Sequence, residues 1–411
     1  MAILEGIRIR NYRALKDVML GKVFYNQTSP TLTRLVAVIG ANGTGKSSLV
    51  DALEFLGDCL KEGVEAACNK PHRGGFERLR TQDRKEPIAF EILYRQDANS
   101  APISYALVID CNANGSAYVY YEGLLRNFSY AEDNTKDKGL TFLKIRDGKG
   151  EAWFRDITSA GEGHERMIPV EMADRAMLGI ATLGSLANHP QIAAFRQFLS
   201  GWYLSYFVPQ LARTQPMAGI DPHLDRNGEN LANYVQYVER KNPAGFQTML
   251  GRIARKIPGI RAIKSVKAPD RRLLLEFQME GYETPFYQQD MSDGTLKMLA
   301  YLLLMEDPEP APLIGIEEPE NGLHPQLLAD LAMEFKTFAR EERGPQVLIT
   351  THAPNFVDAL SPEEVWILDK GKDGFARITR AADIRGVPEL FAEGLPMGSL
   401  WYSDHFGIGN P

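Results

Sequence analysis

The sequence has 411 residues, of which 44% are hydrophobic and 24% charged, and its formal net charge is -7. This is the composition of a soluble globular protein with about two to three domains, and the negative charge excludes a polycation that coats nucleic acid, although local basic patches remain possible. The three cysteines form no C-x-x-C pair, which favours reduced thiols and a cytoplasmic location over a disulfide framework or a zinc site. Charges interrupt the apolar N-terminal residues, and no run of about 18 apolar residues occurs, so we expect neither a signal peptide nor a membrane partner.

The first third of the chain predicts β-strands around a glycine-rich loop. Alternating apolar and charged residues predict a strand at Ile3–Asn11, and the apolar run Leu35–Ile39 predicts a short buried strand. The loop after this strand has the spacing G-x-x-x-x-G-K-S and leads into a helix at Ser47–Leu60, where apolar residues recur with helical spacing. Farther along, three strand-like runs predict a β-meander: Ile88–Tyr94, Ser104–Ile109 and Ala117–Leu124.

The glycine-rich loop has the chemistry of a phosphate site. Its glycines let the backbone curl so that successive N–H groups point inward, and the positive end of the following helix adds to this anion cradle. Lys46 supplies a positive charge for the β- and γ-phosphates, and the Ser47 hydroxyl can bind Mg²⁺. A chance glycine-rich turn is the alternative, but strand, loop and helix follow in the order that the motif requires. The predicted phosphate-binding residues are Gly40, Asn42, Gly43, Thr44, Gly45, Lys46, Ser47 and Ser48.

The middle of the chain is less diagnostic. The polar segment Lys70–Lys85 predicts an exposed loop, in which Gln82 could contact a metal or water or simply be solvated. Arg166–Leu211 predicts mostly helix, and Leu224–Arg240 predicts a turn followed by a helix. Gly251–Arg272 is the most basic segment and could bind a phosphate backbone, be a solvated face or contact an acidic partner. The candidate nucleic-acid contacts are Arg252, Arg255, Lys256, Arg261 and Lys264.

A second group of motifs begins near residue 291. Ser292, Asp293 and Gly294 form a small-residue turn at the start of a strongly apolar helix within Met291–Met305. Such a turn exposes N–H groups at the positive end of a helix, so it can bind an anion, although taken alone it indicates only a helix cap.

Paired acids follow the next predicted strand, Leu313–Ile316. Of Glu317 and Glu318, one carboxylate can hold Mg²⁺ and the other can polarise an attacking water. A tight loop then leads to a predicted helix at Pro325–Arg340, and the strand after this helix is followed by His352. A histidine at the carboxyl end of a parallel strand lies where α/β sheets bind ligands.

Together these stretches resemble the ATP-binding cassette (ABC) class of ATPases, and more closely the soluble RecF, SMC and OLD-like branch of AAA-family ATPases. The resemblance is carried by the Walker A motif GANGTGKS, the signature SDGT, the Walker B motif and D-loop GIEEPENGLHP, and the switch-histidine strand ITTHAP. NGENLANYVQYVE is similar to a helix common in this group. Two features depart from the pattern: Glu317 stands where many cassettes have Asp, and the lack of a long coiled-coil insert argues against a true SMC protein.

The resemblance implies an α/β fold, namely a P-loop ABC-type ATPase head with a mixed central sheet and an inserted α/β lid region. The expected parts are a first ATPase lobe over 1–125, an insertion over 126–285 and a second ATPase lobe over 286–411. The implied cofactors are ATP and Mg²⁺, with Ser47 and Glu317 as metal ligands. Glu318 and His352 are the implied catalytic residues of an ATPase.

The same resemblance implies partners. The signature of one chain would cap the ATP held by another, which gives a homodimer or a higher homo-oligomer. Members of this group often act as nucleotide-gated sensors or scaffolds for a separate nuclease or toxin, commonly in bacterial defence against phage. The alternatives are a RecF-like DNA-binding repair ATPase and the energy subunit of a membrane transporter, against which the long insertion counts.

Overall fold

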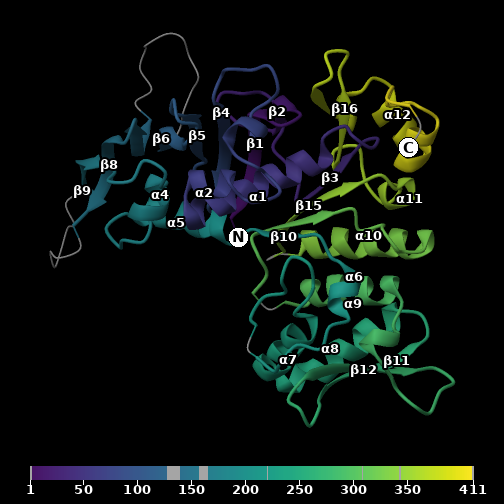
Figure 1. Ribbon diagram of the computed structural model, residues 1–411. Coiled ribbons are helices and arrows are strands. Elements are labelled where there is room, and N and C mark those ends of the chain that lie inside the picture. Colours follow the sequence, from purple (N-terminus) through teal and green to yellow (C-terminus); the bar gives the residue numbers. More distant parts are fainter. Residues whose placement is uncertain are drawn as a thin grey trace.

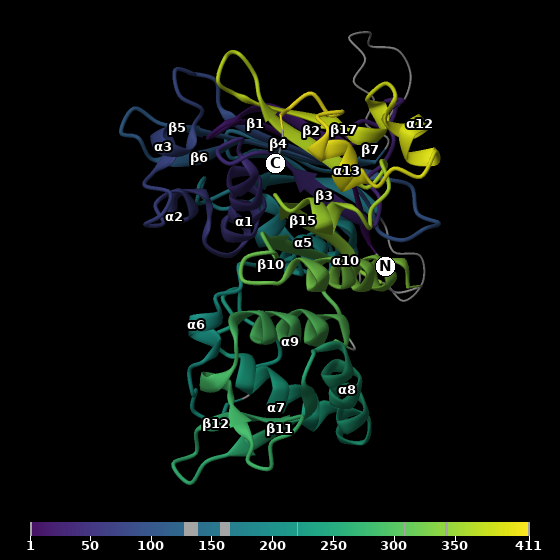
Figure 2. The same ribbon diagram turned by 90° about the vertical axis from the view of Figure 1, so that its right-hand side faces the viewer.

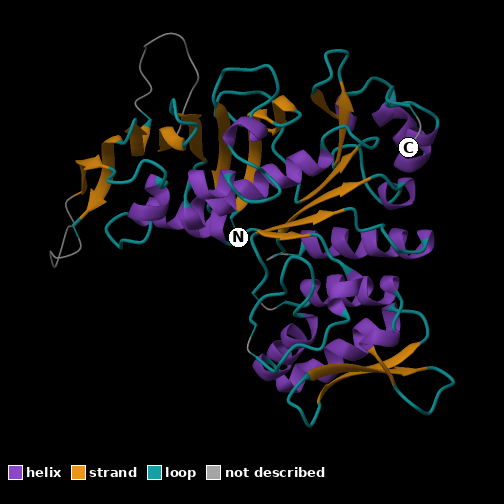
Figure 3. Cartoon of the chain, in the orientation of Figure 1, coloured by secondary structure: helices purple, strands orange, loops and turns teal. Residues whose placement is uncertain are grey.

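The computed structural model describes residues 2–126, 139–156, 165–219, 221–307, 309–341 and 344–409, and these form an upper body and a lower lobe (Figure 1). The upper body holds an eight-stranded and a six-stranded sheet, and the lower lobe holds helices and a three-stranded sheet (Figure 3). Helix α1 (Lys46–Glu62) contacts strands of both larger sheets, because its apolar residues face their shared core.

The eight-stranded sheet is antiparallel throughout and has the order β2-β1-β4-β5-β6-β7-β8-β9. Its strands are β1 (Ile3–Tyr12), β2 (Leu15–Gly21), β4 (Ile88–Arg95), β5 (Ile103–Cys111), β6 (Ala117–Arg126), β7 (Leu140–Arg146), β8 (Lys149–Arg155) and β9 (Glu165–Glu171). The predicted first strand and the predicted meander are thus confirmed. The pairing of β6 with β7 runs across the domain boundary expected at residue 125, and that boundary stays a prediction.

The six-stranded sheet has the order β10-β14-β15-β3-β16-β17. Its strands are β10 (Tyr203–Ser205), β14 (Leu313–Glu317), β15 (Gln346–Thr351), β3 (Leu35–Ile39), β16 (Val365–Lys370) and β17 (Ala376–Arg380). Neighbouring strands are parallel except for β16 and β17, so this is the predicted mixed central sheet. All residues of β3 are buried, as expected for a parallel strand covered on both faces.

Parallel pairing brings the carboxyl ends of β14, β15 and β3 to one edge of the sheet. Glu317 pairs with Thr350, and Thr351 pairs with Ile39, so the segments that follow these strands begin side by side. The predicted helix Pro325–Arg340 is confirmed as α10, with Pro325 in its first turn, where a missing N–H costs nothing.

The lower lobe lies below α10 and is built around helix α9 (Asp293–Met305), which packs against α10 (Figure 2). Most residues of α9 are buried, which agrees with its apolar composition on all sides. The lobe also contains α7 (Leu231–Lys241), α8 (Pro243–Lys256), β11 (Ile260–Lys267), β12 (Leu273–Met279) and β13 (Phe286–Tyr287), and α6 (Pro209–Ala212) lies beside α9 (Figure 2).

The prediction of mostly helix over Arg166–Leu211 was partly wrong. Its first residues form β9, because they pair with β8, and Met172 and Ala176 lie in the turn that follows. The remaining helices are α2 (Val64–Cys68), α3 (Phe76–Leu79), α4 (Gly179–Leu183), α5 (Pro190–Ser200), α11 (Pro354–Val357), α12 (Val387–Ala392) and α13 (Met397–Tyr402), with 3₁₀ turns at Gln288–Asp290 and Ala381–Asp383. In the part of the chain that the structure describes, no helix is long and apolar enough to cross a membrane.

The prediction of an exposed loop at Lys70–Lys85 was partly wrong, because the segment contains helix α3, which buries Phe76 and Leu79, and because Arg73 is only 2% exposed. Its guanidinium donates from Nε to Asp51 Oδ1 at 2.9 Å and from Nη1 to Asp58 Oδ2 at 2.6 Å. Both acids belong to α1 and are themselves buried. The loop therefore folds onto α1, because ion pairs with these two carboxylates offset the cost of burying the guanidinium.

Candidate functional site

The predicted phosphate loop connects β3 to α1 and is tightly held. A side chain on Gly40 would place its Cβ 2.2 Å from the carbonyl oxygen of Leu368, so this position requires glycine. Gly43 and Gly45 have φ values of 80° and 112°, in the left-handed region that glycine adopts without strain. Gly45 precedes α1 and no side chain caps that helix, so its first N–H groups are available to an anion.

The side chain of Lys46 folds back over the phosphate loop that precedes it. Its ammonium donates to the carbonyl oxygens of Gly40 at 2.8 Å and Ala41 at 3.2 Å, and the residue is 5% exposed. Nζ also lies 4.0 Å from Glu318 Oε1. Burial lowers the pKa of Lys46, while the nearby carboxylates, Glu318 first among them, act in the opposite direction.

The other predicted phosphate-binding residues lie on the same loop and the first turn of α1. Asn42, Gly43 and Ser47 are exposed, Ser48 is half-buried, and the Thr44 hydroxyl donates to the carbonyl of Ala41 at 2.9 Å. The structure brings these residues together as predicted, and their binding of nucleotide stays a prediction.

The paired acids end β14 beside this loop. The side chain of Glu317 is half-buried and forms no ion pair or hydrogen bond with a described residue. Glu318 has a φ of 45°, unusual for a residue with a side chain, and its N–H is fixed to the carbonyl of Thr350 at 2.9 Å. A backbone held in this region costs on the order of 1–3 kcal/mol and typically marks a functional position.

The carboxylate of Glu318 is central to the cluster. Its Oε2 accepts from Asn321 Nδ2 at 3.1 Å, and its Oε1 lies 3.5 Å from His352 Nδ1. Together with Lys46, these contacts come from the ends of three neighbouring strands. A carboxylate, an ammonium group and a histidine thus meet within one small volume, the groups that a phosphoryl-transfer site needs.

The sequence analysis missed Glu320 as a site residue, although it follows the paired acids directly in the sequence E-E-P-E, residues 317–320. It is 7% exposed, and its Oε1 accepts the backbone N–H of His352 at 2.6 Å. His352 Nδ1 lies 3.0 Å from the same oxygen, an ion-pair distance without the alignment of a hydrogen bond. Glu320 therefore fixes the backbone of His352 and faces its ring.

The signature turn begins α9. Ser292 caps the helix by accepting the N–H of Thr295 at 3.2 Å, and Asp293 accepts from Arg213 Nη2 at 2.6 Å. A Cβ on Gly294 would lie 2.9 Å from the carbonyl oxygen of Gly322, so the turn packs against the loop that follows Glu318. Among the described residues, no hydrogen bond or ion pair joins Ser292, Asp293 or Gly294 to the phosphate loop of the same chain.

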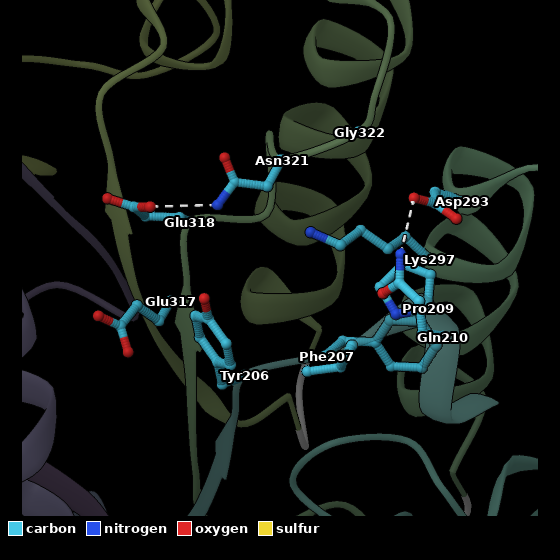
Figure 4. A pocket seen from close by; sticks show the side chains of 11 residues that line it. Tyr206, Phe207, Pro209, Gln210, Asp293, Lys297, Glu317, Glu318, Asn321 and Gly322 are labelled. Atoms are coloured by element: carbon cyan, nitrogen blue, oxygen red, sulfur yellow. Dashed lines mark hydrogen bonds between the residues drawn. The ribbon is translucent and has the colours of Figure 1, made fainter.

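A cavity of about 250 Å³ separates the signature turn from the paired acids (Figure 4). Side chains from both sides line it: Tyr206, Gln210, Asp293, Lys297, Glu317 and Glu318. Sequence reasoning missed Gln210, which belongs to none of the motifs, and Lys297, which follows the signature on α9 but is not marked by its neighbours as a cavity residue. Gln82, the glutamine considered from the sequence, is exposed after α3 and does not line this cavity.

A second acidic group, Asp51, Glu54 and His72, has ligand atoms within 4.8 Å of one another, as a metal site requires. Asp51, however, already accepts hydrogen bonds from Tyr12 at 2.6 Å and Arg73 at 2.9 Å. The group is therefore explained by the ion-pair network around Arg73.

The predicted basic segment is partly neutralised within the chain. Arg252 forms an ion pair with Glu306, and Lys256 forms one with Glu334 of α10. The other three candidates are exposed and form no ion pair with a described residue: Arg255, Arg261 and Lys264. Nucleic-acid contact at these residues stays a prediction.

Comparisons with known proteins identify the fold and the family. A head domain of SMC, solved bound to the C-terminal winged-helix domain of ScpA, superimposes with a TM-score of 0.52 at 12% identity, covering 92% of this chain and 96% of that one. A second SMC head, with an extended coiled coil and bound to the C-terminal domain of ScpA from Pyrococcus furiosus, gives 0.50 at 13% identity with the same coverage. These similarities show an ABC-type ATPase head fold, as predicted.

A search of curated proteins finds no match. The sequence profile of one family does match, over residues 35–152 and 180–358, and it spans all the motifs described above. Because this match covers more than half of the chain, the protein belongs to the AAA-domain family described as "AAA domain, putative AbiEii toxin, Type IV TA system".

Proposed function

We propose that this chain binds and hydrolyses ATP. The observation that supports this function best is the meeting of Lys46, Glu318 and His352 at the carboxyl ends of adjacent strands, with Lys46 Nζ 4.0 Å from Glu318 Oε1. In the proposed mechanism the phosphate loop holds the β- and γ-phosphates, and Glu318 takes a proton from the attacking water. Glu320 fixes the backbone of His352, and the imidazole ring of His352 then lies beside the γ-phosphate.

The residues at the site fit Mg²⁺, the expected companion of ATP. The Ser47 hydroxyl and the Glu317 carboxylate are hard oxygen donors, and that carboxylate forms no ion pair or hydrogen bond with a described residue. Bound there, the ion would neutralise charge on the phosphate oxygens.

The proposal extends to an ATP-dependent homodimer or higher homo-oligomer. The signature turn lies in the lower lobe, at the amino end of α9 (Figure 1), and no hydrogen bond or ion pair between described residues joins it to its own phosphate loop. Its N–H groups are therefore suited to the γ-phosphate bound by a second chain. Two helix N-termini, one at Lys46 and one at Gly294 of the second chain, would then hold the nucleotide between them. A triphosphate reaches both termini, whereas a diphosphate does not.

In the cell we propose a nucleotide-gated sensor or scaffold for a separate effector, a nuclease or toxin, in bacterial antiphage defence. The family description, which names a putative toxin of a type IV toxin–antitoxin system, supports a role in such paired systems. The alternative, a RecF-like DNA-binding repair ATPase, rests on the three unpaired basic residues. Co-purification from the native host distinguishes them: a nuclease or toxin partner supports the first and DNA alone the second.

The ATPase proposal is tested with two variants at the site. Lys46→Ala should abolish ATP binding in calorimetry, because the main positive charge for the phosphates is lost, whereas Lys61→Ala at the exposed end of α1 should bind normally. Glu318→Gln should bind ATP but release phosphate slower by orders of magnitude, because an amide cannot take the proton of the water. If Glu317→Gln stops turnover while Glu318→Gln does not, the roles of the two carboxylates are reversed.

A further inference from the structure

Lys297 is a buried cation without a partner. It lies on α9, one turn beyond Asp293, and is 4% exposed. It forms neither a hydrogen bond nor an ion pair with any described residue. The ammonium group is not among the unpartnered atoms that are fully shielded from solvent, so it stays open to the cavity that Lys297 lines and can bind an anion there.

The ammonium group is directed into the cavity described above. Figure 4 shows the side chain extended from α9 toward the loop that carries Glu318 and Asn321. Three carboxylates line the cavity: Asp293 pairs with Arg213, Glu318 accepts a hydrogen bond from Asn321, and Glu317 is the proposed ligand of Mg²⁺. Burial lowers the pKa of Lys297, and Glu320, Asp293 and Glu318 act in the opposite direction.

The same cavity adjoins the reaction site. Glu317 and Glu318 line it, and Glu318 faces Lys46 of the phosphate loop at 4.0 Å. Tyr206 also lines the cavity and is 44% exposed, so the cavity reaches the protein surface at this residue. Its volume of about 250 Å³ greatly exceeds the share of one water molecule in the liquid, about 30 Å³, so a tetrahedral oxyanion fits.

We propose that this cavity is a binding site for inorganic phosphate, the second product of ATP hydrolysis, and that Lys297 is its anion-binding residue. The inference rests on the proposed ATPase function. Hydrolysis joins the water oxygen to the γ-phosphorus, breaks the bond to the bridging oxygen of ADP and leaves a proton on Glu318, from which it returns to the product. Phosphate then passes Glu318 into the cavity and leaves at Tyr206, while ADP still fills the phosphate loop.

The test is a titration with inorganic phosphate in the presence of saturating Mg·ADP, followed by calorimetry. Lys297→Met keeps the length of the side chain and removes its charge, and it should weaken phosphate binding roughly tenfold to a hundredfold. Lys297→Arg should restore much of the affinity. Tyr301→Phe is the control, because it removes a buried hydroxyl without a partner, one turn along the same helix, and leaves the charge of Lys297 in place.

Two further readouts separate this site from the phosphate loop. The affinity for ATP should stay within about twofold in Lys297→Met, and thermal stability should be equal or higher, because an unpaired buried charge has been removed. Should the Met variant fail to fold, Lys297→Gln serves in its place. Equal phosphate affinity in parent and variant overturns the proposal, and so does a parent that binds no phosphate beside Mg·ADP. Because this titration needs no turnover, a parent that binds phosphate but hydrolyses no ATP would refute the ATPase proposal alone.

Discussion

The buried carboxylate of Glu320 offers the sharpest test of how the site is assembled. Glu320→Gln keeps the shape of the side chain and removes its charge. The change affects the N–H of His352, which Oε1 accepts at 2.6 Å, and the His352 ring, whose Nδ1 lies 3.0 Å from the same oxygen. Neither contact involves the phosphate loop, so the variant should bind ATP with the affinity of the parent.

The expected effect on turnover follows from these contacts. Exchanging a charge-assisted hydrogen bond for a neutral one loses about 1–2 kcal/mol. If this energy holds His352 in its working position, kcat should fall roughly tenfold, with KM for ATP unchanged. Steady-state phosphate release gives kcat and KM, and calorimetry gives the affinity for ATP.

Glu364→Gln is the matched control, because Glu364 is also a buried carboxylate, 5% exposed, but pairs with Lys336 and Arg340 away from the site. It should lower stability and leave kcat near that of the parent. A double-mutant cycle provides the decisive comparison. If Glu320 acts through His352, Glu320→Gln should add little to His352→Ala; a full tenfold loss in that background would refute the positioning role.

Three further predictions address the assembly, the basic segment and the pH dependence. Ser292→Arg should bind ATP but neither dimerise nor turn over, and mixing it with Lys46→Ala should restore partial phosphate release, since mixed dimers contain one intact composite site; flat activity with mixed dimers present would contradict the head-to-tail arrangement. Neutralising the unpaired basic residues should weaken any DNA binding and flatten its salt dependence by about one unit per contact, whereas neutralising the paired ones should not. The unpaired set is Arg255, Arg261 and Lys264, and the paired set is Arg252 and Lys256. Burial raises the pKa of Glu122 to about 7, so between about pH 5 and 7 the folded chain keeps a proton that the unfolded chain has lost, and stability should fall as the pH rises through this range. Glu122→Gln should remove this fall, as measured by thermal unfolding at each pH. Parallel curves of melting temperature against pH for the two proteins would contradict the prediction.

The sequence was most informative where chemistry and local structure coincide. The phosphate loop needs its glycines, its lysine and its flanking strand and helix within one short stretch, and the structure has all of them in that order. The helix Pro325–Arg340 was predicted with both ends correct, because Pro325 marks its first turn and apolar spacing marks its length. The mixed sheet followed from the resemblance and is confirmed by its strand pairing.

Prediction failed where a residue's partners are remote in sequence. Arg73 looked solvated because its neighbours are polar, yet its partners lie on α1. The spacing of Asp51, Glu54 and Asp58 places three acids along one side of an otherwise apolar helix, and that was the available signal. Lys297 gave no such signal, because its burial depends on how the lower lobe meets the loop after β14.

The contacts between the lobes indicate which parts of the site must move together. A Cβ on Gly294 would lie 2.9 Å from the carbonyl of Gly322, so the signature turn cannot approach or tilt without displacing the loop that holds Glu318. The ion pair of Lys256 with Glu334 ties the lower lobe to α10, which follows the same loop. No comparable contact joins the signature to the phosphate loop among the described residues. A change at the γ-phosphate sensed by one chain's signature would therefore reach that chain's own Glu318 first, which would link the two composite sites of a dimer through their carboxylates.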